Sequence, residues 1–111
     1  METKWIEVDR LLIVKLKEEI DHHVAEKIRR KVDYEIQRYL PKKVIFDFSS
    51  VNFMDSAGIG MIIGRYKLIS MFGAIMEIHN VCIQIQKILQ MSGVTNLVKV
   101  CIEEEEIKHA W

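Results

Sequence analysis

The sequence has little of several features that would point to a specialised class of protein. It contains 2 cysteines and 1 proline in 111 residues, so neither a disulfide framework nor proline-rich linkers organise the fold. Its 16 basic residues balance 16 acidic ones, and a formal net charge of +0 provides no overall field for nucleic acid or anionic lipid. The uncharged stretch 56–64 ends at Arg65, well short of the roughly 20 residues that a membrane-spanning helix needs. We therefore expect neither a nucleic-acid partner nor a membrane partner.

What the chain does contain is the composition of a folded domain. Apolar residues make up 50% and charged residues 29% of the sequence, which is unlike the composition of disordered proteins. A chain of 111 residues has the length of one domain, so we expect a single domain over residues 1–111. Its first residues show no apolar signal segment, and the cysteine content suits a reducing compartment. A cytoplasmic location is therefore expected.

Hydrophobic periodicity predicts alternating strands and helices. Apolar residues at every fourth position from Val24 to Leu40 predict a helix with Asp21 as its N-cap and Pro41 as its stop. A hairpin is predicted over 5–8 and 11–16, further strands over 44–48, 74–78 and 97–100, and further helices over 57–72, 83–91 and from Glu103 onward. The order β-β-α-β-α-β-α-β-α defines an α/β fold, with a mixed sheet of about five strands and about four helices on one face or on both.

The segment 52–60, Asn-Phe-Met-Asp-Ser-Ala-Gly-Ile-Gly, lies where a buried strand passes into a helix. Such junctions often carry function in α/β folds, and here the junction holds Asp55 and Ser56. One interpretation makes Ser56 an N-cap that satisfies a backbone N–H, a role worth on the order of 1 kcal/mol. That interpretation is compatible with a second, functional role for the same hydroxyl.

Known nucleotide-binding and catalytic motifs fit this segment poorly. Gly58, Gly60 and Gly64 form G-x-G-x-x-x-G, which is one residue longer than the dinucleotide fingerprint, and no G-K-[ST] follows. Met54 stands where the nucleophile motif G-x-S-x-G requires glycine, which disfavours a serine hydrolase. Gly60 and Gly64 instead share one helix face, where missing Cβ atoms would let the helix approach the sheet closely.

Metal-binding and nucleic-acid motifs are also weak. The Asp-His-His run at 21–23 places its histidines on adjacent helical positions, about 100° apart, so both cannot readily bind one ion. His79, Cys82 and Cys101 show no recognisable ligand spacing. The basic residues 29–31 lie among acidic neighbours, which is typical of a solvated helix face. We expect no metal, no cofactor and no catalytic residue.

The predicted helix 57–72 carries more apolar side chains than one buried face requires. Ile59, Met61, Ile62 and Ile63 crowd its first two turns. In a small protein a surplus apolar face is either a protein-docking surface or a contact with a neighbouring helix, and both interpretations stay open. The docking interpretation predicts that these four residues form a partner interface together with the Asp21 loop.

Three segments of the chain together resemble the anti-sigma factor antagonist family, whose fold is the STAS domain. They are Glu-Ile-Asp-His-His-Val-Ala-Glu at 19–26, Phe-Met-Asp-Ser-Ala-Gly-Ile-Gly-Met-Ile-Ile-Gly-Arg-Tyr-Lys at 53–67, and Met-Ser-Gly at 91–93. In that family the serine that matches Ser56 is phosphorylated by an anti-sigma factor that is itself a serine kinase, and a serine phosphatase removes the phosphate. The resemblance also places Asp21 and Asp55 beside that serine.

By this resemblance the protein is a binding module and not an enzyme. Unphosphorylated, it would bind the anti-sigma factor and release a sporulation sigma factor; phosphate on Ser56 would switch it off. Ala57 replaces a second serine of some relatives, which leaves Ser56 as the one candidate there. Two alternatives remain: a STAS-like protein that binds or hydrolyses a nucleotide, and a subunit of a larger STAS signalling assembly.

Overall fold

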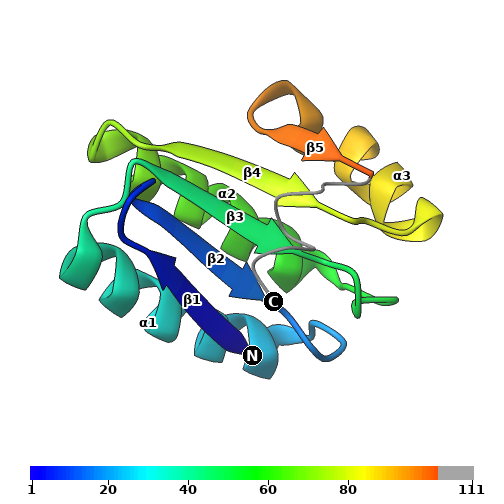
Figure 1. Cartoon of the computed structure of the whole chain (residues 1–111). Helices are drawn as coiled ribbons and strands as arrows, with labels where there is room; N and C mark the ends of the chain where they lie inside the picture. The colour runs from blue at the N-terminus through cyan, green and yellow to red at the C-terminus, as the bar shows by residue number, and fades with distance from the viewer. Residues whose placement is uncertain (103–111) are drawn as a thin grey trace.

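A five-stranded mixed sheet forms the centre of the protein. The computed structural model describes residues 1–102. Its strands are β1 (Glu2–Ile6), β2 (Leu11–Lys15), β3 (Lys43–Asp47), β4 (Ile75–His79) and β5 (Lys99–Cys101). They lie in the order β1-β2-β3-β4-β5, with β1 antiparallel to β2 and every later pair parallel (Figure 1). Each strand therefore lies beside the strand that precedes it in the chain.

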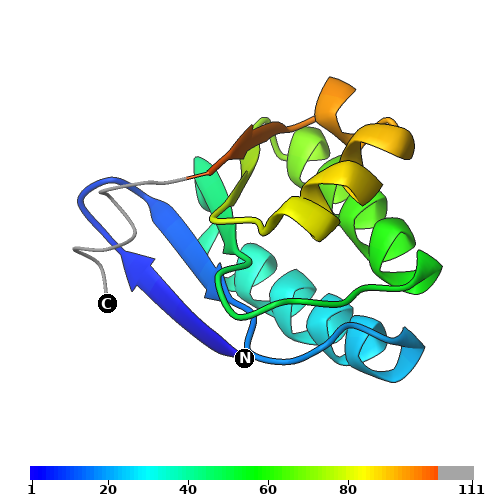
Figure 2. The same ribbon diagram turned by 90° about the vertical axis from the view of Figure 1, so that its right-hand side faces the viewer.

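The helices cover one face of this sheet, as Figure 2 shows. They are α1 (His22–Tyr39), α2 (Ser56–Met71) and α3 (Ile83–Met91), and a short 3-10 helix η1 (Val94–Asn96) leads into β5. Successive parallel connections all step in the same direction across the sheet, so right-handed crossovers place their helices on the same face. In the described part of the chain no helix is long and apolar enough to cross a membrane. The helix predicted from Glu103 onward lies outside the described residues.

Most element boundaries follow the sequence signals, with two corrections. The first strand spans Glu2–Ile6 rather than 5–8, because its pairing with β2 runs from Glu2 opposite Lys15 to Ile6 opposite Leu11, and the residues after Ile6 form the turn. The last strand starts at Lys99 rather than Leu97. The backbone N–H groups of Leu97 and Val98 both donate to the carbonyl of Val94, which keeps this stretch in a helical turn.

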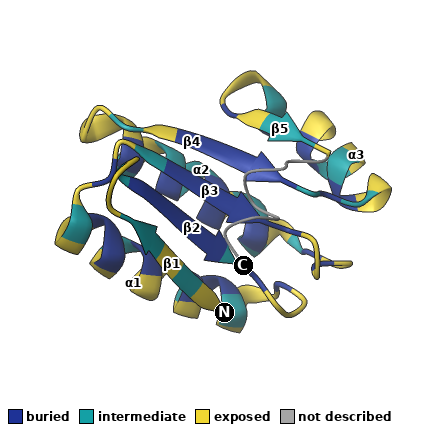
Figure 3. Cartoon of the chain, in the orientation of Figure 1, coloured by how far each residue is buried: buried dark blue, intermediate teal, exposed yellow. Residues whose placement is uncertain are grey.

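Apolar side chains line both faces of the sheet. Leu12, Val44 and Phe46 point to the helix side and belong to the main core. Their sequence neighbours Ile13 and Ile45 are equally buried on the opposite side, and the central strands in Figure 3 are accordingly coloured as buried. Burial on both faces explains why these strands appear in the sequence as nearly continuous apolar runs.

A backbone bridge joins the two loops that lead into α1 and α2. Ile20 pairs with Met54 as an isolated parallel bridge. The N–H of Ile20 donates to the carbonyl of Phe53 at 3.0 Å, and the N–H of Asp55 donates to the carbonyl of Ile20 at 3.0 Å. Asp21 and Asp55 directly follow the bridged residues, so this bridge holds the first turns of α1 and α2 side by side.

Gly58 is the glycine that this junction requires. A Cβ atom at Gly58 would lie 2.1 Å from Cγ of Met54 and 3.2 Å from Cγ2 of Ile20. At Gly60 and Gly64, by contrast, a Cβ atom would meet nothing within 4 Å. The prediction that Gly60 and Gly64 permit a close approach to the sheet is therefore wrong, because the close approach falls on Gly58 and the bridged loops.

Replacing Gly58 by alanine should destabilise the protein. The new methyl group would displace the buried Met54 side chain, at an expected cost of about 1–3 kcal/mol in the free energy of unfolding. Gly60→Ala is the matched control, since it fills open space on the same helix and should stabilise it by about 0.5–1 kcal/mol. Urea denaturation of both variants measures the difference, and equal effects would contradict this account of the junction.

Candidate functional site

Ser56 is exposed and is the first residue of α2. The N-cap is the preceding residue, Asp55, whose Oδ1 accepts a hydrogen bond from the N–H of Ala57 at 2.9 Å. The interpretation of Ser56 as the N-cap is therefore wrong, because Asp55 already supplies the capping oxygen. The hydroxyl of Ser56 stands at the positive end of the helix dipole without being the capping group.

Asp21 repeats this arrangement on the neighbouring helix. It is the N-cap of α1, and its Oδ1 accepts a hydrogen bond from the N–H of Val24 at 2.9 Å. That hydrogen bond, together with the nearby His23, lowers the pKa of Asp21 below its ordinary value. Ile20 forms a bridge with Met54, the residue before Asp55, so the structure places Asp21 and Asp55 on adjacent loops.

A shallow hollow of about 380 Å³ lies beside Ser56, between the start of α2 and the end of α3. Within it Met91 is 89% exposed and Ile59 is half-buried. Four of its seven lining residues are apolar, which is more typical of a protein-binding surface than of a site for a charged small molecule. The hollow is lined by Met54, Asp55, Ser56, Ile59, Ile88, Met91 and Ser92.

Met91 and Ser92 are residues of this surface that the sequence-based list of partner contacts missed. They follow Ser56 by 35 and 36 residues in sequence, and they line the same hollow because the end of α3 lies beside the start of α2. The available signal was the Met-Ser-Gly segment at 91–93, which formed part of the family resemblance but was given no role.

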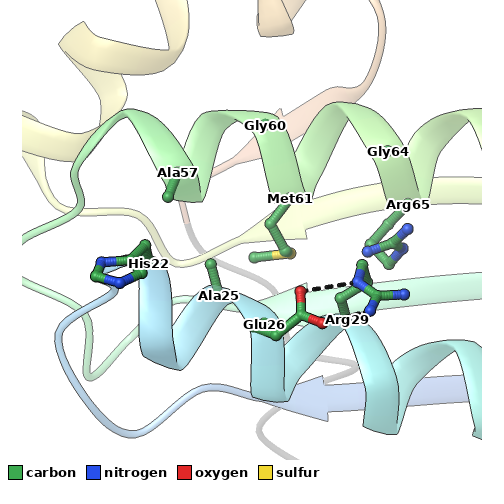
Figure 4. Close-up of a pocket in the computed structure, with 9 residues that line it drawn as sticks. All are labelled: His22, Ala25, Glu26, Arg29, Ala57, Gly60, Met61, Gly64 and Arg65. Atoms are coloured by element: carbon green, nitrogen blue, oxygen red, sulfur yellow. Dashed lines mark hydrogen bonds and ion pairs between the residues drawn. The ribbon is translucent and has the colours of Figure 1, made fainter.

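A second depression, a groove of about 540 Å³, runs between α1 and α2 (Figure 4). Small residues on both helices, including Ala25, Ala57, Gly60 and Gly64, keep it open. Met61 points into it from α2 and is only 6% exposed, so it forms the floor. Gly60 and Gly64 therefore shape a groove on the surface instead of a contact with the sheet.

Charged residues of α1 and α2 lie along this groove in matched pairs. Arg29 donates from Nε to Oε2 of Glu26 at 3.0 Å, and this pairing lowers the pKa of Glu26 to about 2. Nε of Arg65 lies 2.8 Å from Oδ1 of Asp33. Burial raises the pKa of Asp33, an effect that the nearby guanidinium of Arg65 only partly offsets. Arg30 and Lys31 likewise pair with Glu26 and Glu35 of the same helix, so the basic residues 29–31 resemble a solvated helix face more than a nucleic-acid patch.

The four apolar residues predicted to dock a partner divide into two groups. Ile59 and Ile63 are half-buried and present part of their surface. Ile62 is 0% exposed and belongs to the main core, so the prediction that it contacts a partner is wrong. Met61 offers only the floor of the groove. The cause is the position of α2, which packs on the sheet and against α1 and so needs apolar side chains on two sides.

The glycines of α2 do not form a phosphate-binding loop. Gly58, Gly60 and Gly64 all lie within the helix, after its first residue. The N–H of Gly58 donates to the carbonyl of Asp55 at 3.0 Å, which closes the first turn. A phosphate loop instead presents its N–H groups to the ligand ahead of the helix. This geometry disfavours the nucleotide-binding alternative.

The fold and this junction define a class of protein. The STAS domain family matches residues 4–107, and the chain belongs to that family. Within it the chain is homologous to anti-sigma factor antagonists. The anti-sigma F factor antagonist of Paenibacillus polymyxa is 37% identical over 90 residues, which cover 81% of this chain and 77% of that protein.

Solved structures show the same architecture. The Bacillus cell fate determinant SpoIIAA in its phosphorylated form aligns with a TM-score of 0.73 at 26% identity, over 99% of this chain and 98% of that one. SpoIIAA in its unphosphorylated form aligns with a TM-score of 0.75 at 22% identity, over 97% and 92%. The predicted single α/β fold with a five-stranded mixed sheet is confirmed, with three α-helices among the described residues.

Separate substitutions of Asp55 and Ser56 test which of the two residues caps α2. Asp55→Ala should lower the free energy of unfolding by about 1 kcal/mol, because α2 loses its capping oxygen, whereas Asp55→Ser restores an acceptor and should be nearly neutral. Ser56→Ala should change stability by less than about 0.5 kcal/mol. Chemical denaturation measures all three, and a larger loss for Ser56→Ala than for Asp55→Ala would show that Ser56 carries the cap.

Proposed function

We propose that this protein is an anti-sigma factor antagonist that phosphorylation of Ser56 switches off. The observation that carries the proposal is the position of Ser56, an exposed hydroxyl at the first residue of α2, beside an apolar hollow and outside the capping role. The Paenibacillus polymyxa relative supports an anti-sigma factor as the partner. SpoIIAA, known in a phosphorylated and an unphosphorylated form, supports the switch.

In the active state the unphosphorylated surface binds an anti-sigma factor that is also a serine kinase, and a sporulation sigma factor is thereby released. The interface comprises Asp21, Asp55 and Ser56 together with Met91 and the exposed parts of Ile59 and Ile63. The kinase transfers the γ-phosphoryl group of ATP to Oγ of Ser56 with loss of the hydroxyl proton. A serine phosphatase hydrolyses that ester and restores the hydroxyl. The protein itself needs no catalytic group for this cycle, which runs in the cytoplasm.

The physical basis of the switch is a change of charge at constant fold. A phosphoserine adds about −1.5 to −2 charges at the N-terminus of α2, where the helix dipole and nearby N–H groups tolerate an anion. The same charges add to those of Asp21 and Asp55 on the docking surface. A partner that covers the hollow must then desolvate a dianion next to carboxylates. Every 1.4 kcal/mol of that penalty weakens binding tenfold.

Phosphorylation should occur at Ser56 and nowhere else in the chain. The experiment combines the protein with ATP and the anti-sigma factor encoded in the same genome, and then maps phosphate by mass spectrometry. Ser56→Ala should accept none. Ser92→Ala is the matched control, because its hydroxyl borders the same hollow, and it should be phosphorylated normally. Phosphate on the Ser56→Ala protein would refute the assignment.

A permanent charge at position 56 should weaken the complex without unfolding the protein. Ser56→Asp places a carboxylate at the start of α2, which suits the helix dipole but charges the interface. We expect its affinity for the anti-sigma factor to fall by roughly tenfold or more, while its melting temperature stays close to that of the wild type. Calorimetric titration and thermal unfolding measure the two effects. Unchanged affinity would refute the electrostatic account.

Alanine substitutions on α2 and α3 should distinguish side chains that contact the partner from side chains of the core. Ile59→Ala and Met91→Ala should each weaken binding by about 1–3 kcal/mol if they are central contacts. Ile62→Ala is the control: it should cost about 2–5 kcal/mol of stability and leave affinity unchanged at equal folded fraction. Wild-type affinity in both Ile59→Ala and Met91→Ala would place the docking surface elsewhere.

A further inference from the structure

Three potential metal ligands meet on the face of the sheet that the described helices leave open. Glu77 and His79 are two residues apart on β4, so both side chains leave the same face. Cys101 on β5 is the register partner of His79 and shares that face. One ring nitrogen of His79, a carboxylate oxygen of Glu77 and Sγ of Cys101 lie within 4.8 Å of one another. We propose that this cluster is a binding site for a divalent transition metal, with Zn²⁺ as the preferred ion.

The ligand chemistry favours zinc over magnesium or calcium. Thiolate and imidazole are preferred ligands of Zn²⁺, whereas the hard cations take oxygen ligands. Bonds of roughly 2.0–2.3 Å bring the ligands of a tetrahedral zinc to within about 3–4 Å of each other, so small side-chain rotations close the observed cluster. Thiolate and carboxylate together neutralise the two charges of the ion. Binding releases the thiol proton of Cys101 to solvent.

Burial gives the cluster the character of a specific site. The ring of His79 is 0% exposed. Its Nε2 lies 2.8 Å from Oε1 of Glu77, while Nδ1 is buried with no hydrogen-bond partner among the described residues. Because Nε2 is the ring nitrogen beside Glu77, it is the nitrogen that would bind the ion, in place of its contact with the carboxylate oxygen. Cys101 is half-buried, so an ion in solution can reach its thiol from the surface.

The neighbouring ammonium group is compatible with a metal at this position. Nζ of Lys43 lies 3.3 Å from Oε2 of Glu77, which is the carboxylate oxygen not engaged by His79. A metal bound on the His79 side therefore leaves the Lys43 contact in place. The ion would link Cys101 of β5 to Glu77 and His79 of β4. Only three residue pairs join these two strands. Metal binding should thus stabilise this edge of the sheet.

Cobalt provides a direct test, because a Co²⁺–thiolate bond gives a charge-transfer absorption in the near ultraviolet. Untagged full-length protein titrated with Co²⁺ should develop this band, saturate at one equivalent, and lose it on addition of Zn²⁺. Cys101→Ser should abolish the band. Cys82→Ser is the matched control: this half-buried cysteine is the N-cap of α3, outside the cluster, and its replacement should leave the band intact. The adjacent His22 and His23 cannot produce the band, because it reports sulfur ligation.

Thermal unfolding supplies the second readout. Zn²⁺ should raise the melting temperature of the wild type and of Cys82→Ser, and the shift should be lost in Cys101→Ser. Glu77→Gln removes one anionic ligand and should weaken Co²⁺ binding at least tenfold. Circular dichroism of the metal-free variants establishes that each is folded. Absence of the band in folded wild type, its persistence in Cys101→Ser, or its loss in Cys82→Ser would overturn the site, and none of these results bears on phosphorylation of Ser56.

Discussion

The parallel bridge between Ile20 and Met54 is the contact on which the surface around Ser56 depends. Each bridged residue stands immediately before an N-capping aspartate, so two buried side chains determine where α1 and α2 begin. Gly58 provides the space that lets Met54 occupy the interior. Ser56 is therefore placed by the residues behind it, and its own side chain remains available to solvent and to a partner.

In this arrangement the proposed modification site, Ser56, is a different residue from those that hold the start of α2 in position. Asp55 provides the capping oxygen and Met54 provides the anchor, while Ser56 contributes neither. A modification of Ser56 then alters the electrostatic potential of the surface without removing an interaction that stabilises the fold. The proposed switch needs no mobile segment to transmit the signal, since the atom to be modified would lie within the proposed docking surface itself.

The sequence predicts the limits of helices and strands better than it predicts which side chains come into contact. The helix 83–91 has the predicted limits, and α1 begins after its predicted cap, because apolar periodicity and capping residues are local signals. The choice between Asp55 and Ser56 as the cap could not be made, since both residue types cap helices well. Ile59 and Ile62 could not be distinguished either, because a helix packed on two sides is apolar around most of its circumference. His79 and Cys101 lie opposite each other because of the register between β4 and β5, and their spacing along the chain does not predict that register.

The strand order also bears on how the chain folds during synthesis. Because every strand lies beside the strand before it, the sheet can grow by addition at one edge as the polypeptide leaves the ribosome. The β1–β2 hairpin can form first, and each later strand then pairs with a strand already in place once a helix-containing crossover of 19–27 residues has closed. The Ile20–Met54 bridge can form soon after β3 joins, before β4 is made. The contact that fixes the start of α2 can thus form early, whereas β5, the shortest of the described strands, is added after the other four.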